Sequence, residues 1–446
     1  MSDVSADSAP GHCPPGHCPP DTGDRQGRRR AVRHVIRALT REDIPEFLSI
    51  DQWAFAFDNV QKAAFAKNFA ESMDWDHVYG VALADDAPHV GNYGWIPFSL
   101  AVPGGTVPCA GVTAVGVHPL HRRKGCLRAM MQHHLTDAVE AGRVVSALFA
   151  AEMPIYGRFG FGPASQSLRL TIPRGAALHP LAGSCPGPSL RLEIADQERH
   201  LDELAECYEA WRVRRPGSVD RVEHAHRADP FIDPPESRQG TESLRVLIAE
   251  GEQGEPARGY AIFCRSLPGK GHSGGTVQVK EFIARDPGTA HTLWSALVDL
   301  DLMGSLRTCP LSLDDPIMHL LVDSRGPKPE ISDNLWVRIL DLPAALAGRD
   351  YAAPVDTVLE VTDELIGSNA GRWHLRGGPQ GAHCTRTDSP ADLSLDVRTL
   401  ASAYLGGHSL GALAEGGLVN ELVPGTLLPA STALGWPVAP FSAWCF

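Results

Sequence analysis

The segment that most constrains the fold is residues 115–128, VGVHPLHRRKGCLR. Its first part is typical of a strand, its centre is a basic turn containing Gly125, and residues 124–141 carry the apolar spacing of an amphipathic helix. A strand, turn and helix in this order direct successive backbone N–H groups and the positive helix end at one point, and the three cations at 122–124 reinforce that charge. The segment therefore predicts a pyrophosphate-binding site that needs no metal.

Other phosphate-binding loops do not fit this segment. A Walker A loop requires GxxxxGK[ST], and a dinucleotide site requires GxGxxG with a carboxylate for the ribose; neither pattern is present. Coenzyme A remains as the ligand, with a plain solvated helix start as the alternative. The R-x-x-G arrangement resembles the acyl-CoA signature of the GNAT superfamily of N-acetyltransferases. Leu127 departs from that signature, because many members have Gly or Ala there.

A second motif, residues 155–164 (IYGRFGFGPA), follows the apolar strand pattern at 144–150. Its three glycines allow the backbone to approach a ligand closely. The phenol of Tyr156 has an ordinary pKa of about 10 and can donate a proton to a thiolate leaving group. The alternative is a buried tyrosine that only hydrogen-bonds a backbone carbonyl.

Length and composition bound the class of protein. A chain of 446 residues predicts two to four domains, and 43% hydrophobic residues suffice for their cores. No apolar run approaches the roughly 18 residues that span a bilayer, so we expect no membrane partner. The net charge of −13 argues against a nucleic-acid partner. Ten cysteines without paired CxxC spacing, and no apolar leader, favour a reducing cytoplasm and no metal.

The hydrophobic pattern divides the chain into four parts. Residues 1–32 form a Pro-rich tail that we expect to be disordered. The order strand, helix, antiparallel strands, helix occurs in 33–180 and again in 181–330, which suggests a duplicated fold whose second copy has lost the chemistry. Residues 331–446 form a third domain whose apolar end should be buried. The predicted strands are 36–38, 78–83, 95–102, 109–117, 144–150, 190–194, 244–249, 260–265, 277–284 and 335–340, and the predicted helices include 124–141, 201–214, 290–303 and 342–347.

The chain from about residue 33 onward resembles the Eis (enhanced intracellular survival) family of acetyltransferases. The segments that carry this resemblance, in family order, are 121–125, 155–164, 279–282, 335–345, 384–388 and 404–408. The resemblance implies an α+β fold with two tandem GNAT-type domains, each a mixed central sheet with flanking helices, and a sterol-carrier-like α/β domain at the C-terminus. It also implies a homo-hexamer.

The resemblance assigns roles to individual residues. The backbone amides of Val115 and Val117 would hold pantetheine, and residues 122–127 would hold the pyrophosphate of acetyl-CoA. Tyr156 would be the general acid, and the terminal carboxylate of Phe446 the general base. The cofactor-binding residues expected in full are Val115, Gly116, Val117, Arg122, Arg123, Lys124, Gly125, Cys126, Leu127, Arg128, Ala151 and Glu152.

The acceptor site is expected near the first helix. Trp53, Phe55 and Phe57 correspond to an aromatic wall of the family's amine pocket, and ordinary core aromatics are the alternative. Either Asp51 or Asp58 can pair with a substrate ammonium. Cys445 stands where aminoglycoside-modifying members have an acidic residue. That departure separates this chain from those members.

The expected activity is acetyl-CoA-dependent acetylation of a primary amine on a cationic, aminoglycoside-like small molecule. Transfer would be direct, because Cys126 and Cys445 have no histidine partner beside them in the sequence. Lysine side chains of peptides or proteins, or an amino-sugar metabolite, are alternative acceptors. The competing class is a non-catalytic module that binds CoA or a lipid.

Overall fold

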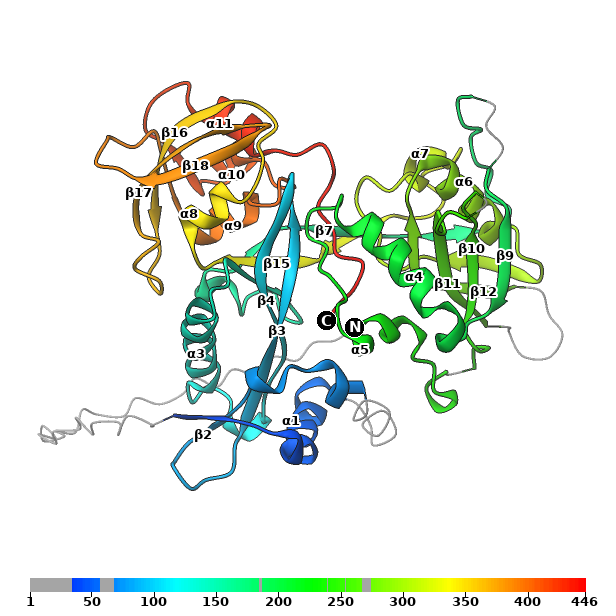
Figure 1. The fold of residues 1–446 in the computed structure, drawn as a ribbon, viewed down its shortest axis with the longest axis horizontal. Helices are drawn as coiled ribbons and strands as arrows, with labels where there is room; N and C mark the ends of the chain where they lie inside the picture. Colours follow the sequence, from blue (N-terminus) through cyan, green and yellow to red (C-terminus); the bar gives the residue numbers. More distant parts are fainter. Residues whose placement is uncertain (1–33, 57–67, 184–186, 239, 253, 267–273) are drawn as a thin grey trace, which may run out of the picture. The chain divides into compact units, whose positions relative to one another are not determined.

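The computed structural model describes residues 34–56, 68–183, 187–238, 240–252, 254–266 and 274–446 (Figure 1). The predicted disordered tail, 1–32, lies outside these residues. The fold class expected from the sequence is confirmed: two mixed sheets with flanking helices are followed by a smaller α/β domain.

The first sheet has seven strands, of which β4 and β5 run parallel. In spatial order they are β1 (Val35–Ala38), β2 (Val78–Ala82), β3 (Gly91–Val102), β4 (Gly105–Val117), β5 (Val145–Phe149), β15 (Leu335–Ile339) and β6 (Gly162–Pro163). Helix α1 (Ile44–Phe55) packs Phe47 and Leu48 on one face of this sheet, and α3 (Cys126–Glu140) packs Met130 and Met131 on the other. The alternation of side chains along each strand separates the two cores.

The second sheet repeats this plan with six strands. In spatial order they are β8 (Thr171–Pro173), β13 (Met303–Arg307), β12 (Gly275–Ala284), β11 (Gly259–Ser266), β10 (Arg245–Ala249) and β9 (Leu190–Ile194). Helices α4 (Gln197–Arg212) and α6 (Pro287–Val298) contribute to separate cores on its two faces. The parallel pair here is β12 with β13, as β4 with β5 is in the first sheet.

One predicted helix was too long. The pattern predicted 290–303, but α6 ends at Val298 and Met303 begins β13. Met303 continues the apolar spacing of the helix, which misled the prediction, whereas Leu302 adopts a left-handed conformation (φ 66°) that redirects the chain into the strand.

The two sheets exchange their last strands. β8, which follows the strands of the first sheet that precede it in the chain, pairs with β13 of the second sheet, and β15, which follows the strands of the second sheet, pairs with β5 of the first. Just before these two strands, β7 (Gln166–Arg169) precedes β8 and β14 (Glu330–Asp333) precedes β15, and the two pair with each other as a separate two-stranded ribbon. The two GNAT-type halves therefore complete each other.

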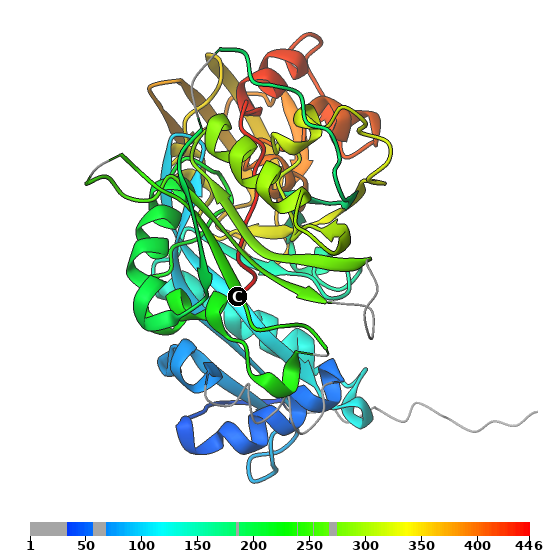
Figure 2. The same cartoon turned by 90° about the vertical axis from the view of Figure 1, so that its right-hand side faces the viewer.

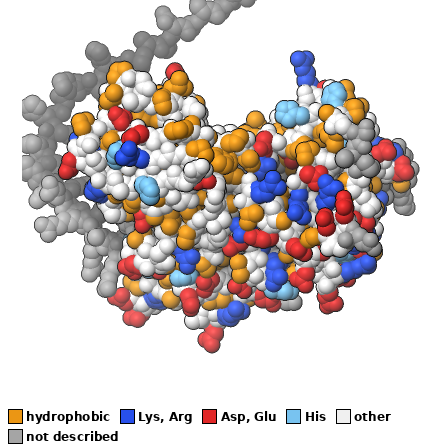
Figure 3. All heavy atoms as spheres, turned by 45° about the horizontal axis from the view of Figure 1, so that its top comes forward, with side chains coloured by type: hydrophobic (Ala, Val, Ile, Leu, Met, Phe, Trp, Pro, Cys, Tyr) orange, Lys and Arg blue, Asp and Glu red, His pale blue; other side chains and the backbone are white. Residues whose placement is uncertain are grey.

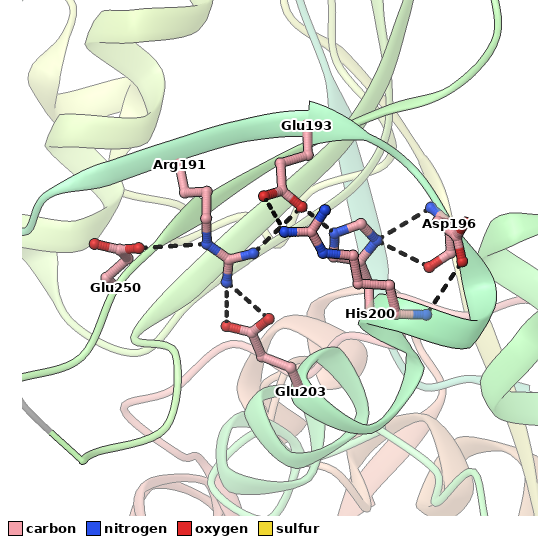
Figure 4. Close-up of polar contacts among 7 residues, drawn as sticks. Arg191, Glu193, Asp196, His200, Glu203 and Glu250 are labelled. Atoms are coloured by element: carbon pink, nitrogen blue, oxygen red, sulfur yellow. Dashed lines mark hydrogen bonds and ion pairs between the residues drawn. The ribbon is translucent and has the colours of Figure 1, made fainter.

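The edge strand of the second sheet carries an ion-pair network (Figure 4). On β9, Arg191 donates to Glu203 at 2.7 Å and to Glu250 at 3.3 Å. Glu193 contacts His200 of α4 at 2.7 Å. Charged side chains on an edge strand discourage pairing with another chain, so we interpret this cluster as protection of the edge.

The third domain contains a five-stranded sheet and four short helices. Its strands in spatial order are β18 (Gly381–Arg386), β17 (Gly371–Gly378), β16 (Val355–Thr362), β19 (Leu393–Asp396) and β20 (Val419–Glu421), and its helices are α8 (Leu342–Ala347), α9 (Val397–Ala403), α10 (Leu410–Glu415) and α11 (Leu427–Leu434). Its core is continuous with that of the first sheet. Arg338 of β15 donates twice to Asp363, at 2.7 and 2.8 Å, in a fully buried ion pair that joins the two regions.

The surface carries charges of both signs. On the face in Figure 3, acidic and basic side chains are interspersed with apolar ones. Within the described ranges, no helix is long and apolar enough to cross a membrane. The same ranges contain no cluster of three or more His, Cys, Asp or Glu side chains placed to hold a metal ion.

Candidate active site

The site is built around a fork between β4 and β5. These parallel strands pair only from Cys109 to Gly111 on β4, opposite Val145 to Ala147 on β5. Beyond Gly111, β4 continues to Val117 without β5 as a partner. A bulge at Ala114 (φ 50°) offsets β4 against β3 and turns the strand within this unpaired stretch. The fork therefore offers free backbone N–H and C=O groups to a ligand.

A cavity of about 550 Å³ follows the free part of β4 to the start of α3. Ten of the twelve predicted cofactor-binding residues line it: Val115, Val117, Arg122, Arg123, Gly125, Cys126, Leu127, Arg128, Ala151 and Glu152. Gly125 is the left-handed N-cap (φ 91°) of α3, and it provides no side-chain cap, so the first N–H groups of the helix remain available.

This cavity fits an acyl-CoA. Exposed guanidinium groups of Arg122, Arg123 and Arg128 stand with the open helix N-terminus at one end, where a pyrophosphate is stabilised by charge and by backbone N–H groups. The unpaired edge of β4 at the other end can hydrogen-bond an extended amide chain as a neighbouring strand would.

Two predicted cofactor residues lie beside this cavity. Lys124 is exposed, and its Nζ lies 3.3 Å from Nδ1 of His121. Its backbone carbonyl accepts a hydrogen bond from His34 at 2.8 Å, which holds the basic turn. Gly116 packs under α1: a Cβ there would lie 2.8 Å from Oδ1 of Asp51. Both residues therefore shape the turn and strand.

Tyr156 lies where this cavity meets a second one. It follows β5, precedes the short 3-10 helix Gly157–Phe159, and is buried. Burial, with a smaller contribution from Glu152, raises the pKa of its phenol to about 12. The phenol therefore keeps its proton at neutral pH and can donate it.

The second cavity, of about 520 Å³, lies on the α1 side of the fork and shares Phe55, Val115, Ala151 and Tyr156 with the first. Asp51 lines it from α1. Its Oδ1 accepts from Asn92 Nδ2 at 2.8 Å, and the same amide donates to Ala114 O at 3.2 Å. Burial raises the pKa of Asp51 to about 7. At neutral pH this carboxyl group is therefore close to half protonated, and a cation bound beside it would favour its charged form.

Phe446 also lines this second cavity. Its ring lies 4.9 Å from Phe98 and 5.2 Å from Phe149, centroid to centroid. Gly111 makes room for it, since a Cβ there would lie 2.9 Å from the Phe446 ring and closer still to Phe98. The base of the fork is therefore shaped to seat the terminal residue.

The segment before Phe446 is fixed by residues of the second domain, and it runs toward α5 (His224–Ala228) between the two sheets (Figures 1 and 2). Ala439 is held from both sides, because Arg215 donates to its carbonyl at 2.8 Å and Asp314 accepts from its N–H at 2.9 Å. Further hydrogen bonds join Phe441 N to Pro216 O, Ser218 Oγ to Phe441 O, Ser442 N to Asn334 Oδ1, and Trp444 Nε1 to Asp229 Oδ2.

The predicted aromatic wall is placed unevenly. Phe55 lines both cavities, whereas Trp53 is 63% exposed, lines neither, and lies 6.0 Å from the His118 ring. Phe57 and Asp58 lie outside the described residues. Phe69, Phe149 and Trp444 supply aromatic surface that the sequence analysis did not assign.

Polar side chains of the second cavity were also missed, among them His226 on α5 and Asp229 just after it. They lie in the second domain, more than 60 residues along the chain from the motifs at 115–128 and 155–164, and no local pattern marks them. Cys126 and Cys445 are poor nucleophiles: burial raises the pKa of Cys126, and burial with nearby Asp229 raises that of Cys445 to about 11.

Three family models match this chain. Two describe an acetyltransferase (GNAT) domain, over residues 35–164 and 217–339, and one a sterol carrier protein domain, over residues 342–443. An uncharacterized N-acetyltransferase of Streptomyces coelicolor is 39% identical over 363 residues, which cover 79% of this chain and 84% of that protein. The N-acetyltransferase Eis of Mycobacterium bovis is 36% identical over 337 residues, covering 73% and 78% of the two chains.

A solved structure supports the same relation. The crystal structure of Eis1 from Mycobacterium abscessus superposes with a TM-score of 0.78 at 29% identity and covers 92% of this chain and 100% of its own. Sequence, domain order and fold thus agree with the resemblance noted above. The chain belongs to the Eis family of GNAT N-acetyltransferases and is an acyltransferase enzyme.

Proposed function

We propose that this enzyme transfers an acetyl group from acetyl-CoA to a primary amine of a cationic small molecule. The observation that carries the proposal is the junction of two cavities at Tyr156 and Val115. One cavity has a cationic end suited to a pyrophosphate, and the other contains carboxylates and aromatic rings suited to an ammonium. A donor and an amine can meet only where both cavities open.

The residues of the chain divide the chemistry among them. Bound acetyl-CoA supplies the acetyl thioester, held by the arginines at 122, 123 and 128 and by the free edge of β4. The carboxylate of Phe446 takes a proton from the ammonium, which otherwise has a pKa near 10 and no lone pair for attack. A backbone N–H near Ala114 or Val115 stabilises the negative charge that develops on the carbonyl oxygen. The neutral amine attacks the thioester carbon, and Tyr156 donates its proton to the sulfur as the C–S bond breaks. The second proton that the nitrogen loses on becoming an amide restores the phenol.

Changing the end of the chain tests the base. One glycine added after Phe446 displaces the carboxylate by about 3.8 Å, the spacing of consecutive residues. We expect this extension to reduce kcat by at least about 100-fold while the Kd for CoA stays unchanged, because the base acts by position. The matched control carries the extra glycine at the N-terminus and should keep full activity. Equal kcat for both proteins would exclude Phe446 as the base.

An amine panel identifies the acceptor class. CoA release is measured with aminoglycosides, linear amines and diamines, lysine peptides and amino sugars. Release with small cationic amines supports the proposal, and release with lysine peptides alone would redirect it to protein acylation. The homo-hexamer expected from the family resemblance remains a prediction, which sedimentation velocity tests.

A further inference from the structure

The second cavity, which would hold the acceptor, contains a side-chain carboxylate besides Asp51. Asp229 begins the short 3-10 helix Asp229–Phe231, directly after α5, and it lines the cavity together with His226. The two residues are three positions apart on consecutive helical turns, a spacing that places side chains on one face. Both come from the second GNAT domain, so this wall of the cavity is independent of the catalytic motifs.

The charge of Asp229 is not neutralised by an ion pair within the described ranges. Its Oδ2 accepts from Trp444 Nε1 at 3.1 Å and its Oδ1 from Asn68 Nδ2 at 3.3 Å, and both donors are neutral. The guanidinium of Arg221 attracts it but donates to Glu281 at 2.8 Å. A carboxylate has about four lone-pair positions, so two remain for a ligand.

His226 adds an acceptor with a defined tautomer. Its Nε2 lies 2.8 Å from the Ser72 carbonyl, which can only accept, so Nε2 carries the hydrogen and Nδ1 has the lone pair. The side chain is 2% exposed, and Nδ1 has no partner among the described atoms. Burial lowers the pKa of this imidazole, which keeps it neutral and able to accept.

The surroundings favour a cation over a neutral ligand. Trp444 and Phe98 present their rings to His226 at 5.0 and 5.7 Å, centroid to centroid, and aromatic faces attract cations. Burial raises the pKa of Asp229 because the charged carboxylate loses hydration. A bound ammonium would offset this loss and favour the charged form. Trp444 also lies 6.0 Å from the Phe446 ring, so this pair of side chains is next to the proposed base.

We propose that His226 and Asp229 form a second cation subsite, which holds the non-reacting ammonium of a diamine or polyamine while its other amine reacts beside Tyr156 and Phe446. This inference rests on the proposed function, since it names the class of amine accepted. It also identifies Asp229 as a specificity-determining residue. Asp229 supplies a carboxylate to the cavity, whereas the penultimate residue, Cys445, has none.

The test compares 1,5-diaminopentane with n-pentylamine, which differ only in the distal ammonium. We expect the native enzyme to prefer the diamine in kcat/KM by about 10- to 100-fold, the range for a buried hydrogen-bonded charge. Asp229→Asn should remove that preference by raising KM for the diamine more than KM for the monoamine, so that the kcat/KM values of the two amines become similar. A series of diamines with three to eight carbons should show one optimal length.

Two variants separate binding from support of the C-terminal segment. Trp444→Phe removes the hydrogen bond to Asp229 but keeps its carboxylate, so the diamine preference should survive. Asp220→Asn, which removes a carboxylate bonded to Ser99 N outside the cavity, should also leave it intact. The subsite is excluded if the preference survives in Asp229→Asn, if that variant loses kcat equally with both amines, or if Trp444→Phe reproduces its effect.

The two proposals fail in different ways. Equal efficiency with the diamine and the monoamine would overturn the subsite and leave amine acetylation intact. A lack of transfer to every amine in the panel would overturn the proposed function itself.

Discussion

At the scale of single residues, burial decides which groups can act. The phenol of Tyr156 is held in its acid form by desolvation, which raises its pKa to about 12. The same effect keeps the thiols of Cys126 and Cys445 protonated and unsuited to attack. One physical cause thus supports Tyr156 as a proton donor and direct transfer without an acyl-cysteine.

Replacing Tyr156 tests its role as the acid. We expect Tyr156→Phe to lower kcat by about 100-fold, within the usual range of general acid catalysis, while the Kd for CoA stays unchanged. Since the raised pKa preserves the acid form, native kcat should not fall through pH 10, where an ordinary tyrosine would lose its proton. Stopped assays of CoA release from pH 6 to 10.5 check both points.

A control distinguishes catalysis from loss of a buried hydroxyl. Tyr351→Phe removes a fully buried hydroxyl, bonded to Leu346 O in the third domain, and should leave kcat unchanged. If Tyr156→Phe keeps native kcat and pH dependence, another group must be the acid.

The predictability of site residues depended on their separation in the chain. Arg122 and Gly125 belong to one short strand, turn and helix, so their convergence follows from local geometry alone. His226 and Asp229 reach the same site only because the second domain packs against the C-terminal segment. No sequence pattern encodes that packing.

At the scale of elements, the fork between β4 and β5 is the feature on which both cavities depend. Hydrogen bonding stops at Gly111, and there the missing side chain admits the ring of Phe446. The end of the paired segment therefore fixes both where the donor chain can lie and where the proposed base is seated.

A methyl group at the base of the fork should disturb this arrangement. We expect Gly111→Ala to displace Phe446 and Phe98 and to lower kcat by roughly 10- to 100-fold, because small misplacements of catalytic groups are costly. Gly105→Ala, on the same strand, meets only an ordinary contact at 3.5 Å and serves as the control. Similar kcat values for Gly111→Ala and Gly105→Ala would show that the fork tolerates the displacement of Phe446.

The sequence predicted the bounds of strongly periodic helices and strands well, but it did not predict which strands pair with one another. The strand predicted at 190–194 coincides with β9, and the helix at 342–347 with α8. The strand at 335–340 also exists, as β15, but it lies in the first sheet. Side-chain alternation indicates a buried strand and contains no information on which sheet receives it.

At the scale of the whole molecule, the second GNAT domain fixes the position of the C-terminal segment, residues 439–446, by hydrogen bonds. Arg215, Asp314 and Ser218 bind its backbone, and Asn334 binds Ser442 from the chain just before β15. This offers a physical reason to retain a domain that lacks a basic turn of its own: it positions Phe446 for the first domain.

Removing hydrogen bonds between the second domain and the C-terminal segment should lower the rate of catalysis and leave the binding of acetyl-CoA intact. We expect Asp314→Ala, which removes the acceptor for Ala439 N and the partner of Arg215, to lower kcat about 10-fold with an unchanged Kd for CoA. Hydrogen exchange should accelerate at residues 439–444. Asp301→Ala breaks an exposed pair with Arg174 and provides the comparison. Native kcat together with faster exchange would separate the C-terminal segment from the chemistry.

The exchange of β8 and β15 also bears on how the chain is made. Leu335 of β15 pairs with Phe149 of β5, so one edge of β5 stays unpaired until β15 is synthesised about 190 residues later. At roughly 5–20 residues per second, that wait lasts about 10–40 s on the ribosome. During this time the first half has an unpaired edge strand, the kind of surface that recruits another nascent chain. Translation speed between residues 150 and 340 therefore sets how long each new molecule is exposed to aggregation.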